Sequence, residues 1–127
     1  MTTTANQKVS AADVQAHRDA LETPAGVAAF LGDLLGFTLT AELASVDVST
    51  ARRWADSKTQ PGTDPERKLR AAAQVARLLL QSDASHTVRA WFIGMNPQLG
   101  DSSPIDAIAE GHLKDVLSAA RAFQDGA

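Results

Sequence analysis

The stretch DPERKLRAAAQVARLLL, residues 64–80, decides the fold. Its apolar residues recur at intervals of three and one, which is the spacing of one face of an α-helix. Asp64 can accept a hydrogen bond from a free amide of the first turn, and Pro65 suits the first helical position because it has no N–H group. The pattern predicts a long helix that ends near Ser82 and buries Leu69, Ala72, Ala73, Ala76, Leu79 and Leu80.

Shorter helices are predicted on both sides of this stretch. A capping residue followed by proline occurs again at residues 23–24 (Thr-Pro) and 103–104 (Ser-Pro), and each pair predicts the start of a helix. Helices often end at a glycine in the left-handed conformation, and Gly36 and Gly111 suit this position. Strand signals are nearly absent, because tyrosine is missing and no β-branched residues alternate with polar ones. We therefore predict an all-α protein of six to eight helices, near residues 11–21, 24–35, 40–46, 50–57, 64–82, 85–93, 103–110 and 112–123.

The chain has 127 residues, a common size for a single domain. Residues 1–10 are polar and without period, and we expect a flexible tail there. We expect a helical domain over residues 11–83 and a small C-terminal helical lobe over residues 84–127, joined by the long helix. The first domain would be a bundle with a helix-turn-helix-like unit at residues 39–58.

Composition excludes several classes of protein. The chain has no cysteine, which excludes a disulfide scaffold, a zinc site with cysteine ligands and a cysteine nucleophile. No apolar run approaches the ~20 residues that span a bilayer, and the amphipathic helices lack the Lys- and Arg-rich polar face of membrane-surface helices. The first seven residues, MTTTANQ, lack the basic and apolar regions of a secretory signal. We therefore expect a cytoplasmic protein that makes no contact with membranes.

The net charge of −3 conceals an uneven distribution. Residues 51–80 carry seven Lys or Arg and three Asp or Glu, a net charge of +4, whereas residues 1–50 carry −4 and residues 91–127 carry −3. A basic segment between acidic ends can mark a site for an anionic partner. The alternative is that these charges belong to solvated helix faces.

Residues 39–54, LTAELASVDVSTARRW, have the pattern of two short helices joined by a tight turn. The hydroxyl of Thr40 is expected to cap the first helix, and that of Ser49 the second. Apolar and small residues would pack the two helices against each other and against the core: Leu43, Ala44, Val46, Val48, Ala51 and Trp54. The stretch resembles a helix-turn-helix.

A helix-turn-helix would place its second helix in the major groove of double-stranded DNA. Arginine can form two hydrogen bonds with guanine, and hydroxyl groups at a helix N-terminus suit phosphate. The candidate DNA-binding residues are Ser49, Thr50, Arg52, Arg53 and Lys58, with Arg67, Lys68 and Arg70 as further phosphate contacts. The alternative is a packed helix pair whose arginines are solvated.

A second motif lies in residues 89–108, RAWFIGMNPQLGDSSPIDAI. Asn96 precedes Pro97 and must therefore leave the α-region, and its side chain can brace the loop by bonding nearby backbone. Trp91 and Phe92 lie about 100° apart on a helix, so that one could anchor the core while the other reaches the surface as an interface residue. The alternative is that both pack internally. The candidate partner-binding residues are Trp91, Asn96, Pro97, Leu99, Ser103 and Pro104.

This motif, followed by Gly111 and a closing helix with Val116-Leu117, is similar to the C-terminal toxin-binding domain of the Xre/MbcA/ParS antitoxins. With the helix-turn-helix before it, the resemblance spans most of residues 37–124. It implies a protein that blocks the active-site cleft of a RES-type toxin, an enzyme that degrades NAD, and that binds operator DNA to repress its own operon. It also implies a homodimer or a toxin–antitoxin hetero-oligomer, and no cofactor.

Nothing in the sequence indicates an enzyme. The three histidines, His17, His86 and His112, show no metal-ligand spacing with each other or with carboxylates. The glycines of residues 94–100 match neither a dinucleotide-binding nor a phosphate-binding loop, and no nucleophile elbow is present. Two alternatives to the antitoxin remain: a stand-alone helix-turn-helix transcriptional regulator whose C-terminal lobe mediates dimerisation or another protein contact, and an adaptor that does not bind DNA.

Overall fold

The computed structural model describes residues 23–126, and this part of the chain contains α-helices, one short 3₁₀-helix and no strand. The all-α prediction is confirmed. The predicted helix at residues 11–21 and the predicted tail at residues 1–10 lie outside the described residues. The elements, in order along the chain, are α3 (Pro24–Leu35), α4 (Phe37–Ala44), α5 (Val48–Ala55), α6 (Thr63–Leu80), α7 (Ser85–Ile93), η1 (Pro97–Leu99), α8 (Pro104–Ala109) and α9 (Leu113–Gln124).

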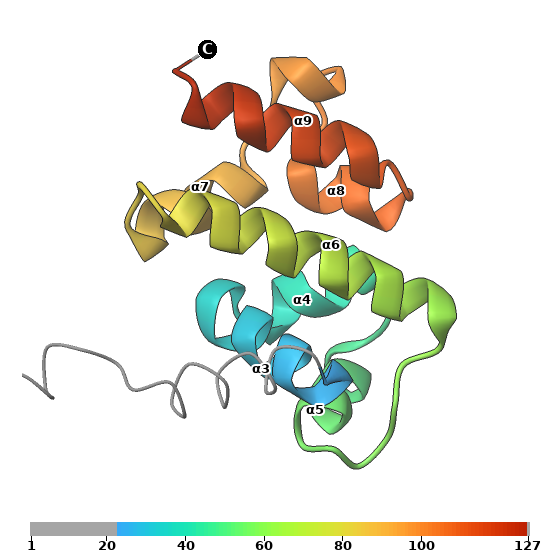
Figure 1. Ribbon diagram of the computed structural model, residues 1–127. Helices are drawn as coiled ribbons and strands as arrows, with labels where there is room; N and C mark the ends of the chain where they lie inside the picture. Colours follow the sequence, from blue (N-terminus) through green and yellow to red (C-terminus); the bar gives the residue numbers. More distant parts are fainter. Residues whose placement is uncertain (1–22, 127) are drawn as a thin grey trace, which may run out of the picture.

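The long helix α6 contacts α3, α4, α7, α8 and α9, and so runs beside most of the molecule (Figure 1). Every apolar residue of α6 that was predicted to face the core is buried except Leu80, which is half-buried. The predicted cap is wrong, because the helix begins at Thr63 with Gly62 as its N-cap. Asp64 lies inside the first turn, where its carboxylate pairs with the Lys68 Nζ atom at 3.0 Å, one helical turn further on.

The helices α3, α4 and α5 form a bundle on one side of α6. The Thr23 hydroxyl caps α3 by accepting a hydrogen bond from the Gly26 amide at 2.9 Å, as the sequence predicts. Gly36 ends α3 with a φ of 88°, a conformation that favours glycine, and α4 begins at the next residue. Thr40 therefore does not cap α4: it is buried within the helix, and its hydroxyl donates to the Gly36 carbonyl at 2.9 Å.

The C-terminal lobe consists of α7, η1, α8 and α9. The bounds of α7 match the prediction, and the Ser103 hydroxyl caps α8 by accepting from the Asp106 amide at 3.1 Å. The helices α6 and α9 lie side by side and run in the same direction (Figure 1). At their C-terminal ends, the Gln124 side-chain amide donates to the Leu78 carbonyl at 3.0 Å and holds the two helices together.

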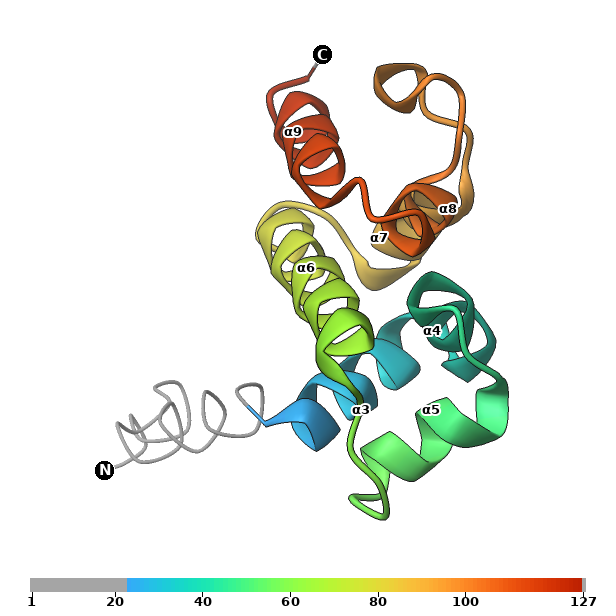
Figure 2. The same ribbon diagram turned by 90° about the vertical axis from the view of Figure 1, so that its right-hand side faces the viewer.

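The bundle and the C-terminal lobe share one hydrophobic core. Figure 2 shows α3, α4 and α5 below and α7, α8 and α9 above, with α6 beside both groups. Buried residues of all these α-helices belong to a single cluster, and α4 packs directly on α8. No helix of the described part is both long and apolar enough to cross a membrane.

Candidate partner-binding and nucleic-acid-binding surfaces

The loop between α7 and α8 is organised by Asn96. This residue is buried, and its Oδ1 atom accepts a hydrogen bond from the Gln98 amide at 2.9 Å. Its backbone carbonyl accepts from the amides of Leu99 and Asp101, both at 2.9 Å, and its own amide donates to the Ser102 carbonyl at 3.1 Å. Asn96 thus braces the loop from within, as the Asn-Pro pair predicts.

The two adjacent aromatic residues of α7 both pack internally. Phe92 is fully buried, and Trp91 is 9% exposed. The Trp91 ring meets Phe92 edge-on at 5.3 Å between centroids, and its centroid lies 6.3 Å from that of Phe123 of α9. The interpretation that one of the pair reaches the surface is therefore wrong, because the neighbouring α9 covers the outer side of Trp91.

The other candidate partner-binding residues lie along the same loop. Pro97 is exposed, Leu99 and Ser103 are half-buried, and Pro104 is buried. The Ser103 hydroxyl caps α8, and Leu99 packs against the core. These residues shape the loop, and a direct contact between them and a partner stays a prediction.

Three large apolar side chains of the lobe are exposed, and sequence reasoning missed them. Ile93 is 53% exposed, Met95 81% and Phe123 38%. Ile93 and Met95 line a hollow of about 490 Å³ between α4 and α8, and Met95 and Phe123 line a second hollow of about 320 Å³ beside η1. We refer to these three residues and the two hollows as the Met95 face. In the sequence, Phe123 is indistinguishable from a core residue, because it fits the apolar period of α9.

The first hollow of the Met95 face is acidic. Glu42 of α4, Asp101 of the loop and Asp106 of α8 all line it. Desolvation raises the pKa of Glu42, and the hydrogen bond to Asp106 and the charge of Asp106 raise it further. The charge of Asp106 thus disfavours the ionised form of Glu42 at the point where the bundle meets the lobe.

The helices α4 and α5 pack against each other and against α3, and their identity as a helix-turn-helix stays a prediction. The helices are joined by three residues, of which Ser45 has a φ of 62°, in the left-handed region where such turns often use glycine. Ala51 and Trp54 are buried against the core, as their spacing predicts. The outer side of α5 is left exposed, including Arg52 and Arg53.

The N-terminus of α5 is occupied by a carboxylate. Asp47, not Ser49, is the N-cap: its Oδ1 atom accepts from the Thr50 amide at 2.8 Å and from the Ser49 hydroxyl at 2.9 Å. Hydrogen bonds from Thr50 and Ser49 lower the pKa of Asp47, so the group is charged at neutral pH. The helix end that the sequence assigned to a phosphate thus already holds an anion.

The basic residues of this region differ in how they are held. The Arg52 guanidinium lies over the Phe37 ring at 4.8 Å, and Arg53 donates to the Thr50 hydroxyl at 3.3 Å, while Lys58 is exposed in the loop after α5. Lys68 and Arg70 form ion pairs within α6, with Asp64 and Glu66, and Arg67 is exposed.

Among residues 23–126, no group of three or more His, Cys, Asp or Glu side chains is placed to hold a metal ion. The arrangement described above offers surfaces for binding: an apolar face with an acidic hollow on the lobe, and a basic helix on the bundle.

Comparison with known proteins shows a shared fold. No family model matches the chain, and no curated protein matches its sequence. The structure is similar to a chain in the crystal structure of the M. tuberculosis MbcT–MbcA toxin–antitoxin complex, with a TM-score of 0.68 and 20% sequence identity. The match covers 80% of this chain and 94% of that chain. The resemblance inferred from residues 37–124 is thus confirmed at the level of the fold.

Proposed function

We propose that this protein is an antitoxin-like binding protein whose Met95 face docks on a RES-type, NAD-degrading toxin in the cytoplasm and blocks its active site. The observation that supports the proposal best is the exposure of Met95, Ile93 and Phe123 on a lobe whose fold occurs in a toxin–antitoxin complex. Inhibition is steric in this proposal, so the protein needs neither a cofactor nor a catalytic residue.

The chemistry of the Met95 face suits such a partner. A flexible methionine beside an aromatic ring forms an adaptable apolar contact, and burying these side chains gives most of the binding free energy. A cleft that receives NAD must accommodate an anionic pyrophosphate and is expected to carry cations. The carboxylates of Glu42, Asp101 and Asp106 beside Met95 would complement those cations.

The test asks whether this protein co-purifies with a RES-type, NAD-degrading enzyme and inhibits the NAD consumption of that enzyme. Met95→Asp places a charge at the centre of the face, and we expect at least a tenfold increase in the concentration needed for inhibition. Met95 is highly exposed, so the variant should keep its fold. Gln60→Asp, in the exposed loop before α6, adds the same charge elsewhere and is the matched control.

The proposal fails if the wild-type protein neither binds nor inhibits that enzyme, or if the Met95 and Gln60 variants behave alike. If Met95→Asp instead converts a homodimer into a monomer, while inhibition is absent in the wild type, the lobe is a dimerisation module and the stand-alone regulator is favoured.

We further propose that α5 contacts double-stranded operator DNA. The three-residue turn before α5 and the exposed cations Arg52, Arg53 and Lys58 support this part. Ser49 and Thr50 are weaker candidates, because Asp47 already takes up the Ser49 hydroxyl and the Thr50 amide. Reading a palindromic operator requires a two-fold dimer, either of this chain alone or within the toxin complex.

Charge reversal at Arg52→Glu and Arg53→Glu together tests this contact. We expect the double variant to lose its shift of upstream operon DNA in a gel, while it still inhibits the toxin. Arg89→Glu, at an exposed position outside α5, is the control. If the wild-type protein does not shift the DNA at low salt, the DNA proposal is wrong. If the double variant loses both DNA binding and toxin inhibition, the bundle and the lobe do not carry separate functions.

A further inference from the structure

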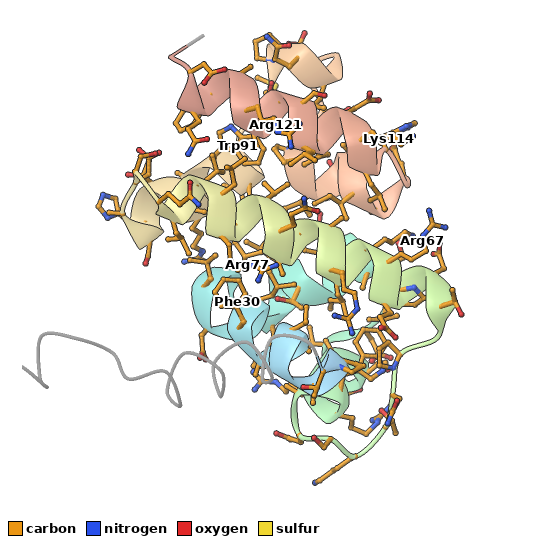
Figure 3. All side chains as sticks on the ribbon, in the orientation of Figure 1. Phe30, Arg67, Arg77, Trp91, Lys114 and Arg121 are labelled. Atoms are coloured by element: carbon orange, nitrogen blue, oxygen red, sulfur yellow. The ribbon has the colours of Figure 1, made fainter. Side chains whose placement is uncertain are left out.

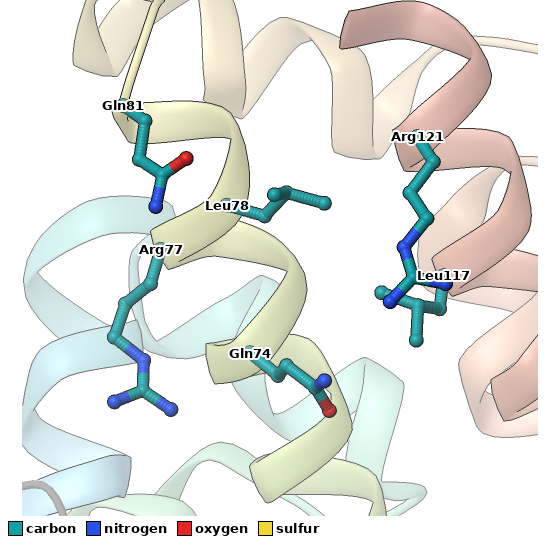
Figure 4. A pocket seen from close by; sticks show the side chains of 6 residues that line it. All are labelled: Gln74, Arg77, Leu78, Gln81, Leu117 and Arg121. Carbon is teal, nitrogen blue, oxygen red and sulfur yellow. The ribbon is translucent and has the colours of Figure 1, made fainter.

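A groove runs between α6 and α9, on the side of α9 away from the Met95 face. It consists of two hollows of about 360 Å³ and about 340 Å³ that share Gln74 and Leu117 as lining residues, so they are continuous. In Figure 4, Gln74 and Leu78 extend from α6 toward α9, while Leu117 and Arg121 extend from α9 toward α6. No residue lines both this groove and a hollow of the Met95 face.

The groove is lined by cations and by no carboxylate. Its charged lining residues are Arg67, Arg70, Arg77, Lys114 and Arg121. Arg70 is paired with Glu66 at 2.8 Å, but in the described part of the chain no ion pair neutralises the other four. Arg67 and Lys114 lie at one end, whereas Arg77 and Arg121 lie further along (Figure 3). A chain with a net charge of −3 thus places Arg67, Lys114 and Arg121 along one groove, while Arg77 extends from the side of α6 away from α9 (Figure 4).

The floor of the groove is apolar and partly uncovered. Leu78, Leu113 and Leu117 are half-buried, and Ala71 and Val75 continue the floor along α6. The hydrogen bond between Gln124 and the Leu78 carbonyl fixes the spacing of the two helices at one end. The groove therefore has a defined width, a leucine floor and basic side chains from both helices.

We propose that this groove binds an acidic amphipathic helix of a partner protein. The stretch from Arg67 to Gln81, the residue that follows α6, covers about 21 Å at the helical rise, enough for about four turns of a bound helix. The apolar stripe of that helix would cover the leucine floor, and its carboxylates would meet the arginines and Lys114 on either side, the usual mode of helix-in-groove recognition. A nucleic-acid backbone would satisfy the cations but would leave the leucines uncovered, so the floor favours a protein partner.

The experiment measures the fluorescence anisotropy of a labelled peptide of about 16 residues, with leucine at helical spacing and glutamate elsewhere. A shuffled peptide of the same composition and a DNA duplex are the comparison probes. The variants of the full chain are Arg121→Glu, which places a carboxylate in the groove, and Leu117→Ala, which removes part of the floor. Arg89→Glu, on the exposed side of α7, makes the same charge change outside the groove.

We expect saturable binding of the striped peptide that weakens with added salt, at least a tenfold loss in Arg121→Glu, a smaller loss in Leu117→Ala, and no loss in Arg89→Glu. Equal binding of the shuffled peptide, equal loss in Arg89→Glu, or preference for the duplex would overturn the proposal. A change of oligomeric state in Arg121→Glu, measured by light scattering, would also overturn the proposal, because a second copy of this chain would then occupy the groove. No toxin is used, so the result is independent of the function proposed for the Met95 face.

Discussion

At the scale of single residues, Asp47 determines where α5 begins, because it binds the Thr50 amide and the Ser49 hydroxyl. Asp47→Ala removes both interactions, and we expect the Tm to fall by a few degrees. Because the pKa of Asp47 is lowered in the folded protein, its contribution is present above the unfolded pKa and is lost as the pH falls through the folded value. Thermal unfolding of both proteins between pH 2 and pH 7 measures this.

Asp47→Asn is the control for this prediction, because asparagine keeps a capping oxygen without the charge. It should restore most of the Tm at neutral pH. If Asp47→Ala and the wild type lose stability in parallel as the pH falls, the carboxylate is not what caps α5.

Helix caps were predictable from the sequence at two of the five positions named, Thr23 and Ser103, whereas Thr40, Ser49 and Asp64 do not cap their helices. Thr23 and Ser103 each precede a proline and both were placed correctly, but Asp64 also precedes a proline and lies inside α6. Asp47 and Ser49 are both good caps two positions apart, and sequence alone does not choose between them. The choice follows from the burial of Ala51 and Trp54, which fixes the rotation of α5 about its axis.

At the scale of elements, the junction of α3 and α4 depends on a glycine. A Cβ atom at Gly32 would lie 2.6 Å from Cε1 of Phe37, the ring that also supports Arg52. Gly32→Ala should gain about 1 kcal/mol of helix propensity but lose about 1–3 kcal/mol through overpacking. We therefore expect a net loss of stability, measured by urea unfolding, together with weaker DNA binding if Arg52 contacts DNA.

A second background tests the cause. In Phe37→Ala the ring is gone, and the same Gly32→Ala change should then be neutral or stabilising. A loss of equal size in both backgrounds would show that the Phe37 ring is not the obstacle.

The positions of the helices could be read from the sequence, whereas the candidate surfaces could not. The apolar period of residues 69–80 predicts α6, but nothing in it says that α9 lies alongside and forms a groove with it. The exposure of Met95 and Phe123 depends on tertiary packing, which the local sequence pattern does not show. Trp91, the most conspicuous interface candidate in the sequence, is covered by that same packing.

At the scale of the whole molecule, Glu42 of α4 and Asp106 of α8 meet across the contact between bundle and lobe. The pKa of Glu42 is raised, so this carboxyl favours folding when protonated, and its contribution is lost as the pH rises through the folded pKa. Glu42→Gln removes this titration, and we expect the Tm of the variant to exceed that of the wild type more at pH 7 than at pH 4.

Differential scanning calorimetry at several pH values measures this difference. Asp33→Asn, which removes an exposed carboxylate on α3, is the matched control. Parallel Tm profiles for Glu42→Gln and the wild type would contradict the interaction between the two carboxyl groups.

The common direction of α6 and α9 has a consequence for polarity. Each helix carries partial positive charge at its N-terminus, so two positive ends lie together beside Arg67 and Lys114. A helix bound in the groove carries partial negative charge at its own C-terminus. It is therefore most stable antiparallel to both neighbours, with its last turn between Arg67 and Lys114, and the groove distinguishes the two orientations of the peptide that it binds.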